Sequence, residues 1–174
     1  MTNKKITLEL SEAGINRAIH ELDTYTNWLK RKAAELLERL AADGCEIASA
    51  YFASAVYDGT NDVSVSVKQH GRHTKAVVAI GSATLFIEFG TGILYPDNHP
   101  EAAENGMVRG QYGHHLGSMP SGWRYKGVPG TNGQPDMKHP EYIHTYGNPA
   151  NMPMYTTVKG LKENLERYAR EVFV

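Results

Sequence analysis

The first quarter of the chain carries a long row of apolar and small side chains at helical spacing. Successive members lie alternately four and three residues apart, and the row consists of Ile15, Ile19, Leu22, Thr26, Leu29, Ala33, Leu36 and Leu40. This row predicts an amphipathic helix of about 30 residues and about 45 Å. Ser11 can cap its first turn, although Gly14 stands where a capping box has Glu. The expected break is Asp43-Gly44, and a second helix is expected from about residue 46 to residue 56.

That first helix is long for the size of the chain. A domain of 174 residues has a radius of gyration of roughly 16 Å. The helix must therefore protrude, bend or pack against a neighbouring subunit. Packing in a hydrophobic core is the interpretation that we favour for the apolar row itself.

Period-two alternation marks the expected strands. A short strand ahead of the long helix is predicted from the alternating Ile6, Leu8 and Leu10. Residues 62–69 alternate valine with polar side chains, and residues 75–81 form a second apolar stretch after the turn at residues 70–73. These two stretches predict a β-hairpin. Residues 83–89 are apolar around a single Glu88, and periodicity leaves open a third strand or a short helix closed by Gly90.

The C-terminal segment again has helical spacing. Pro153 suits the beginning of a helix. An apolar stripe follows at Val158, Leu161, Leu165, Tyr168 and Val172. We expect this stripe to pack in the core, as for the first helix.

Glycine and proline divide the chain into two kinds of segment. All eight prolines lie between Pro96 and Pro153, and eleven of the seventeen glycines lie between Gly90 and Gly147. The sequence therefore predicts one domain over residues 1–174. Its core is expected from about residues 1–92 and 147–174, and a long irregular loop is expected at about residues 93–146.

Charge and cysteine content exclude several classes of protein. The formal net charge of -1 excludes a protein that holds nucleic acid by charge alone. The single Cys45 excludes a disulfide framework and a thiolate zinc site. We expect no secretory signal and no membrane contact, because no apolar run follows the basic start or approaches the length that spans a bilayer. A reducing cytosol, or a particle assembled there, is the expected location.

Histidine is the one reactive residue type that is enriched. Six of the eight histidines pair in sequence, at His70 and His73, His114 and His115, and His139 and His144. None of them has the spacing of a known zinc motif, so we interpret them as exposed loop side chains. No nucleophile elbow or phosphate loop is present, and we expect no enzyme, no cofactor and no metal. A metal-dependent hydrolase that uses the loop histidines stays an alternative.

Aromatic side chains are frequent in the expected loop. The stretch from residue 91 to residue 153 holds four Lys or Arg against five Asp or Glu. A basic nucleic-acid surface is therefore less favoured than a protein contact, for which large aromatic rings are well suited. The contact candidates are Tyr112, Trp123, Arg124 and Tyr125. A nucleic-acid-binding module at residues 123–126 stays a second alternative.

The order of these parts resembles a known family. The segment A-T-L-F-I-E-F-G-T at residues 83–91 and the segment N-P-A-N-M-P-M-Y at residues 148–155 carry the resemblance. Both, together with the long helix and the valine-rich hairpin, are similar to the tail-completion or neck proteins of long-tailed bacteriophages. This is the family named after gene product ten of phage HK ninety-seven. The similar layout covers most of residues 11–174 and is weakest from about residue 95 to residue 144.

The resemblance implies a fold and a role. The fold would be α+β, with the N- and C-terminal helices packed on a small antiparallel sheet. The role would be that of a structural virion subunit, assembled in the bacterial host cytoplasm into a ring, usually of six copies, at the head–tail junction. The partners would be the head connector or stopper and the tail terminator or tube proteins. Phage DNA would pass through the lumen without sequence-specific binding. A tail-terminator ring is the close alternative.

The motif residues carried over from the family are Phe86, Glu88, Phe89, Gly90, Thr91, Asn148, Pro149, Pro153 and Tyr155. Gly90 would give a sharp turn after an apolar segment. We hypothesise that Glu88 accepts hydrogen bonds from a neighbouring subunit or loop. The variant Glu88→Ala would then weaken ring assembly more than monomer folding.

Overall fold

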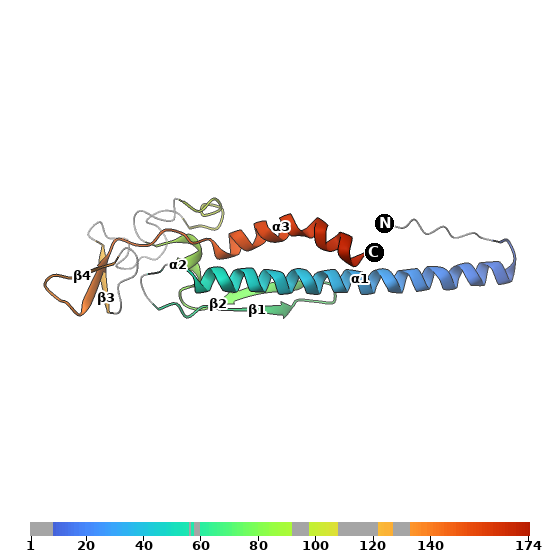
Figure 1. The fold of residues 1–174 in the computed structure, drawn as a ribbon, viewed down its shortest axis with the longest axis horizontal. Helices are drawn as coiled ribbons and strands as arrows, with labels where there is room; N and C mark the ends of the chain where they lie inside the picture. Colours follow the sequence, from blue (N-terminus) through green and yellow to red (C-terminus); the bar gives the residue numbers. More distant parts are fainter. Residues whose placement is uncertain (1–8, 56, 58–59, 92–97, 108–121, 127–132) are drawn as a thin grey trace.

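A single long helix organises the molecule. The computed structural model describes residues 9–55, 57, 60–91, 98–107, 122–126 and 133–174. Helix α1 (Glu12–Ala53) runs for 42 residues, and it spans most of the length of the molecule in Figure 1. The hydroxyl of Ser11 accepts a hydrogen bond from Gly14 N at 3.1 Å, which confirms the expected cap. Of the strand expected at residues 6–10, residues 6–8 lie outside the described residues, and Leu10 is exposed rather than part of a strand.

The predicted break at Asp43-Gly44 is wrong, because α1 continues through it. Gly44 is buried, and a Cβ atom placed there would lie 3.0 Å from Leu161 Cδ1 and 3.1 Å from Val77 Cγ2. The absent side chain lets two other elements approach α1 at one turn. Glycine inside a helix costs about 1 kcal/mol relative to alanine, and close packing on both sides offsets that cost. The helix expected at residues 46–56 is the last part of α1.

The β-hairpin and the C-terminal helix both pack on the C-terminal half of α1. Strands β1 (Ser64–Gln69) and β2 (Lys75–Ile80) are antiparallel, with Ser64 opposite Ile80, which confirms the hairpin. Helix α3 (Pro153–Val172) runs back along α1, and the hairpin lies on another side of α1 (Figure 1). The molecule is therefore of the α+β class, as expected.

Residues 83–89 adopt the helical one of the two predicted alternatives. Helix α2 (Thr84–Phe89) follows the hairpin and ends at Gly90. Its buried Ile87 joins Phe52 of α1 and Ala83 in the core. Val63, Val65 and Ala79 of the hairpin region and Met154 of α3 pack around these residues. The core thus lies at the C-terminal end of α1.

A second sheet lies within the region that was expected to be irregular. It contains β3 (Trp123–Lys126), β4 (Gln134–Pro135) and β5 (Tyr142–Thr145), with β5 in the middle and both pairings antiparallel. The expectation of an irregular loop over the whole of residues 93–146 is therefore wrong for these segments. Short strands among many prolines and glycines lack the length that periodicity needs, so the sequence pattern missed them.

The two helical stripes are only partly in the core. Leu161 and Val172 of α3 face the subunit, whereas Val158 is 48% exposed and Leu165 is 46% exposed. In α1 the half-buried members are Leu36 and Leu40. The other members of the α1 row, Ile15, Ile19, Leu22, Thr26, Leu29 and Ala33, are exposed. The core interpretation is therefore wrong for these six and for Val158 and Leu165, and in the single chain the helix protrudes. None of the described helices is both long enough and apolar enough to cross a bilayer.

Asp62 fixes the start of α2 and makes folding sensitive to acid. Its carboxylate accepts hydrogen bonds from Ser82 N at 2.8 Å, Ala83 N at 3.0 Å and the Ser82 hydroxyl at 2.8 Å. These bonds, the backbone N–H of Ser82 foremost, lower the pKa of Asp62 from 3.8 to about 2. Because the folded-state pKa lies below the unfolded value, the stabilisation is complete above about pH 4 and is lost as the pH falls through about 2.

We therefore expect Asp62→Asn to reduce the acid sensitivity of folding. The variant should be less stable than the wild type at pH 7, and the difference should shrink steadily from about pH 4 to about pH 2. Urea unfolding at a series of pH values measures this. Asp23→Asn, on the exposed part of α1, is the matched control and should leave the pH profile unchanged. A constant difference between wild type and Asp62→Asn across this pH range would contradict the assignment.

Candidate functional site

The two segments that carry the family resemblance come together in space. Residues 86–91 end α2, and residues 148–155 lead into α3, and we call their contact the motif junction. Thr91 N donates to Asn148 O at 2.8 Å, and Asn148 N donates to the Thr91 hydroxyl at 3.0 Å. Asn151 N donates to Ile87 O at 2.9 Å. Segments 57 to 64 residues apart in the sequence are therefore joined by hydrogen bonds of the backbone and of the Thr91 hydroxyl.

Gly90 is at the tightest point of the junction. Its φ of 84° and ψ of 177° belong to a region that only glycine adopts readily. A Cβ atom there would lie 2.7 Å from Asn148 O and 2.8 Å from Ala150 N. The sharp turn expected at Gly90 is present, and the close backbone approach is a second reason for glycine.

Glu88 caps α3 from the side of α2. Its side chain is buried, and its carboxylate accepts hydrogen bonds from Met154 N at 2.7 Å and Tyr155 N at 3.0 Å. Met152, the residue at the cap position, has a φ of 55° and no capping side-chain bond, and Pro153 has no N–H to donate. A carboxylate from another helix thus meets the first free N–H groups of α3, where negative charge is also favoured.

His99 completes the hydrogen bonds of Glu88. Its Nδ1 accepts a bond from Glu101 N at 3.1 Å, so the neutral ring carries its proton on Nε2, which lies 3.1 Å from Glu88 Oε1. The ring packs against Phe89, with centroids 4.4 Å apart, and against Tyr155 at 5.6 Å. His99 is 5% exposed, whereas His70, His73 and His139 among the paired histidines are exposed, as expected, and His144 is half-buried. Sequence spacing carries no signal for this pair, because the ten residues between Glu88 and His99 follow no period.

The hypothesis gave Glu88 a hydrogen-bond partner in a neighbouring subunit or in a loop, and the partners that the structure describes lie within the same chain. Both carboxylate oxygens bind donors of the same chain, one of which, His99, lies in a loop. The residue stabilises the subunit itself. A loss of assembly in Glu88→Ala would follow from a loss of folding.

Asn98 and Asn148 differ in how their side chains relate to the segment before α3. Asn98 makes two hydrogen bonds to Ala150. Its Nδ2 donates to Ala150 O at 3.3 Å, and its Oδ1 accepts from Ala150 N at 3.2 Å. Asn148 is fully buried, and its side-chain amide has no hydrogen-bond partner among the described residues. Pro149, the remaining motif residue of this segment, is half-buried.

The candidates for a loop contact lie elsewhere. Tyr112 and the side chain of Trp123 lie outside what the structure describes. Arg124 in β3 forms an ion pair with Asp136, which also accepts bonds from Lys138 N and His139 N, and Tyr125 is half-buried. The Arg124 guanidinium is the main cause that lowers the pKa of Asp136 to about 2. The second sheet is at the opposite end of the molecule from the protruding part of α1 (Figure 1).

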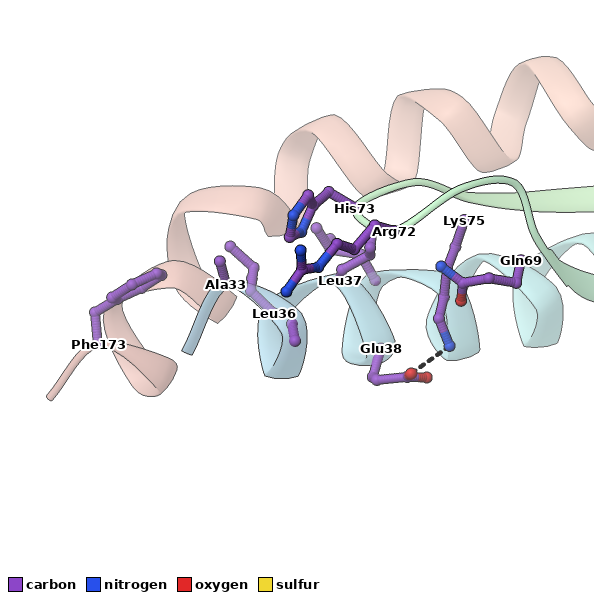
Figure 2. A pocket seen from close by; sticks show the side chains of 11 residues that line it. Ala33, Leu36, Leu37, Glu38, Gln69, Arg72, His73, Lys75 and Phe173 are labelled. Atoms are coloured by element: carbon purple, nitrogen blue, oxygen red, sulfur yellow. Dashed lines mark ion pairs between the residues drawn. The ribbon is translucent and has the colours of Figure 1, made fainter. Parts of the chain in front are cut away.

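Two grooves flank the packed elements. One lies beside the motif junction between α2 and α3, has a volume of about 510 Å³, and includes Leu85, Val158, Lys159 and Lys162 in its lining. The other, of about 300 Å³, lies between α1 and the hairpin turn, and Phe173 of the C-terminal end also lines it (Figure 2). Figure 2 shows Ala33, Leu36 and Leu37 on its α1 side, Arg72 and His73 from the turn, and the Lys75–Glu38 ion pair at its edge.

The motif junction connects two helices through buried hydrogen bonds. The hydrogen-bonding atoms of Glu88 and His99 are occupied by one another and by backbone groups, so the pair holds α3 on α2. Within the described part of the chain, no three His, Cys, Asp or Glu side chains gather as they would around a metal ion.

Comparison with known proteins adds no relative to this description. No protein-family model, curated protein or solved structure matches the chain.

Proposed function

We propose that the chain is a structural virion subunit of a long-tailed bacteriophage, a ring-forming neck or tail-completion protein at the head–tail junction. The phage assignment is based on the resemblance of residues 83–91 and 148–155. The observation that carries the structural role is the apolar row that α1 leaves exposed. Ile19 and Leu22 are both 52% exposed on a helix that projects beyond the rest of the subunit (Figure 1). Exposed apolar rows of this kind typically pack against another protein chain.

The motif junction fits the same role. A subunit that transmits force between head and tail needs its helices fixed to one another. Glu88 and Gly90 fix α3 to α2 through buried hydrogen bonds and a close backbone contact. The arrangement occupies the hydrogen-bonding atoms of Glu88 and His99 within the subunit, which supports a structural role for the motif junction.

Disruption of the gene in its phage or prophage tests this function. Electron microscopy of the lysate should show filled heads and full-length tails that are not joined, and a plasmid copy of the wild-type gene should restore joined particles. Overlong or irregular tails would instead favour the tail terminator. Normal, infectious virions would contradict a structural role at the junction.

A further inference from the structure

The charges of the chain are unevenly distributed. The whole chain has a formal net charge of -1, yet residues 23–39 and 63–80 together carry seven Lys or Arg against three Asp or Glu. The first range belongs to the middle of α1, and the second contains both strands of the hairpin and holds no acidic residue. Positive charge is therefore concentrated where the hairpin turn lies beside α1 (Figure 2).

Three exposed cations form one surface at this place, which we call the basic surface. It consists of Arg72 from the hairpin turn and of Lys30 and Arg31 from α1. Arg72 lines the groove of Figure 2 and extends from the turn over α1. Lys30 lies one helical turn before Ala34, and Arg31 lies two turns before Glu38. Because Ala34 and Glu38 line the same groove, the two α1 cations continue the side of α1 that Arg72 covers.

The acids nearest to the basic surface already have other partners. Glu35 forms ion pairs with Lys32 at 3.3 Å and with Arg39 at 3.4 Å, and Glu38 forms one with Lys75. None of the three cations of the basic surface has an ion-pair partner among the residues that the structure describes. Their positive charge is therefore available to a partner outside the chain.

More distant acids do not cancel this charge. Asp23 is on the Lys30 side of α1 but seven residues earlier, which is about 10 Å along the helix. Glu171 of α3 forms ion pairs with Arg39 at 3.2 Å and with Arg167 at 3.4 Å. Lys68, exposed on β1 close to the turn, adds a further positive charge. The basic surface thus stays positive after these acids are counted.

Hydrogen bonds within the turn fix the position of Arg72. The N–H of His70 donates to Thr74 O at 2.9 Å, and the side-chain amide of Gln69 donates to Thr74 O at 3.2 Å and to Gly71 O. A Cβ atom at Gly71 would have nothing within 4 Å, so the tip of the turn is open to a partner. The backbone N–H groups of the two residues after Gly71 donate to no acceptor in the described part of the chain. Free N–H groups beside a guanidinium suit the oxygens of a phosphate.

We propose that the basic surface binds the phosphate backbone of double-stranded DNA. The choice of DNA is based on the proposed function, because a ring at the head–tail junction surrounds the DNA that leaves the head. The three cations are spread over a hairpin turn and a turn of α1, so they form a broad surface rather than a pocket for one carboxylate. Duplex DNA carries one negative charge about every 1.7 Å of its axis and offers phosphates to all three at once. In the ring, the hairpin turn faces the lumen.

Fluorescence anisotropy of a labelled DNA duplex of mixed sequence, titrated with the full chain, tests the surface. With three phosphate contacts, the affinity should fall about 40-fold as the salt concentration rises from about 50 mM to about 200 mM. The double variant Arg31→Gln, Arg72→Gln keeps one contact. Its affinity at the lower salt concentration should be about tenfold weaker or more, and the same rise in salt should weaken it only about fourfold.

The double variant Lys159→Gln, Lys162→Gln is the matched control. It removes the same charge from two exposed lysines near the N-terminal end of α3, whereas the basic surface lies beside the C-terminal end of that helix. Its affinity for the duplex should stay within about twofold of that of the wild type. Unchanged thermal unfolding verifies the fold of both double variants. Equal losses of affinity in the two, or no binding at the lower salt concentration, would overturn the proposal.

Poly-glutamate separates DNA from an acidic protein as the partner. Unlabelled poly-glutamate should compete with the labelled duplex about tenfold less effectively, per negative charge, than unlabelled duplex does, because the rigid duplex has the denser charge. Equal competition would reject DNA and assign the basic surface to an acidic protein partner.

The DNA contact and the phage function fail separately. Unjoined heads and tails after gene disruption, together with no difference between the two double variants, would reject this surface and leave the neck function standing. A specific loss of DNA binding in Arg31→Gln, Arg72→Gln together with normal virions would support the surface and reject the neck function.

Discussion

Gly90→Ala is expected to lower the free energy of unfolding by about 4 kcal/mol. Two effects act at the same position. The backbone conformation at φ 84° and ψ 177° is strained for any residue with a Cβ atom. That atom would also lie 2.7 Å from Asn148 O and 2.8 Å from Ala150 N, which are backbone atoms held in the hydrogen bonds of the motif junction. Neither neighbour can move without breaking those bonds. Denaturant unfolding followed by circular dichroism measures the loss.

Gly106→Ala separates the two effects. Gly106 also has a positive φ, of 71°, but a Cβ atom there would have nothing within 4 Å. Gly106→Ala should therefore lower the free energy of unfolding only by the backbone strain, about 1 kcal/mol. If Gly90→Ala and Gly106→Ala destabilise the protein equally, the close approach at the motif junction contributes nothing, and our description of the junction is wrong.

Glu88→Ala is expected to lower the free energy of unfolding by about 3 kcal/mol. The substitution leaves Met154 N, Tyr155 N and His99 Nε2 without their acceptor, and it removes a negative charge from the N-terminus of α3. The first turn of α3 should loosen before the rest of the helix. Hydrogen exchange should show this as faster exchange at residues 154 and 155 than in the middle of α3.

Glu88→Gln and Glu101→Ala are the controls for this prediction. Glutamine keeps one acceptor oxygen and the side-chain volume, so the loss should be smaller, about 1.5 kcal/mol. Glu101 lines the groove between α2 and α3, as Glu88 does, but it is exposed. Glu101→Ala should therefore change the free energy of unfolding little. If Glu88→Ala unfolds like the wild type but fails to assemble, the prediction is wrong and Glu88 acts at the subunit interface.

Both predictions assign Gly90 and Glu88 a role in the stability of the subunit. Gly90 and Glu88 make contacts within one chain, and those contacts position α3. Assembly surfaces have to be found among exposed side chains instead. The apolar side chains that α1 leaves exposed, Ile15, Ile19, Leu22 and Leu29, form such a candidate surface, and substitutions there should leave the stability of the monomer nearly unchanged.

The site was only half predictable from the sequence. The two segments at residues 83–91 and 148–155 were selected from their residues, yet nothing in either segment indicates that they touch. His99 was missed, because its role depends on a loop that returns to Glu88. Asn98, which binds Ala150, was missed for the same reason. Contacts between distant segments have no period, so they leave no local pattern.

Local patterns were enough for the hairpin, for α3 and for the start of α1. Alternation at residues 62–69 and 75–81 fixes β1 and β2, since side chains of a strand point to opposite faces in turn. The row from Ile15 to Leu40 fixes a helix, and Ser11 fixes its start. Each of these properties depends on residues a few positions apart, and such neighbours interact in the same way wherever the segment lies in the fold.

Tertiary structure decided what those elements do. The sequence predicts a helix break at Gly44, yet α1 continues through it. Leu161 and Val77 pack in the space that the missing side chain leaves. The apolar row reads as core throughout, but only the half of α1 beside α3 and the hairpin is covered. Burial depends on which other segments are present at a given place, and periodicity carries no information on that. The sequence by itself determined which faces are apolar, and only the folded chain decided which of them remain exposed.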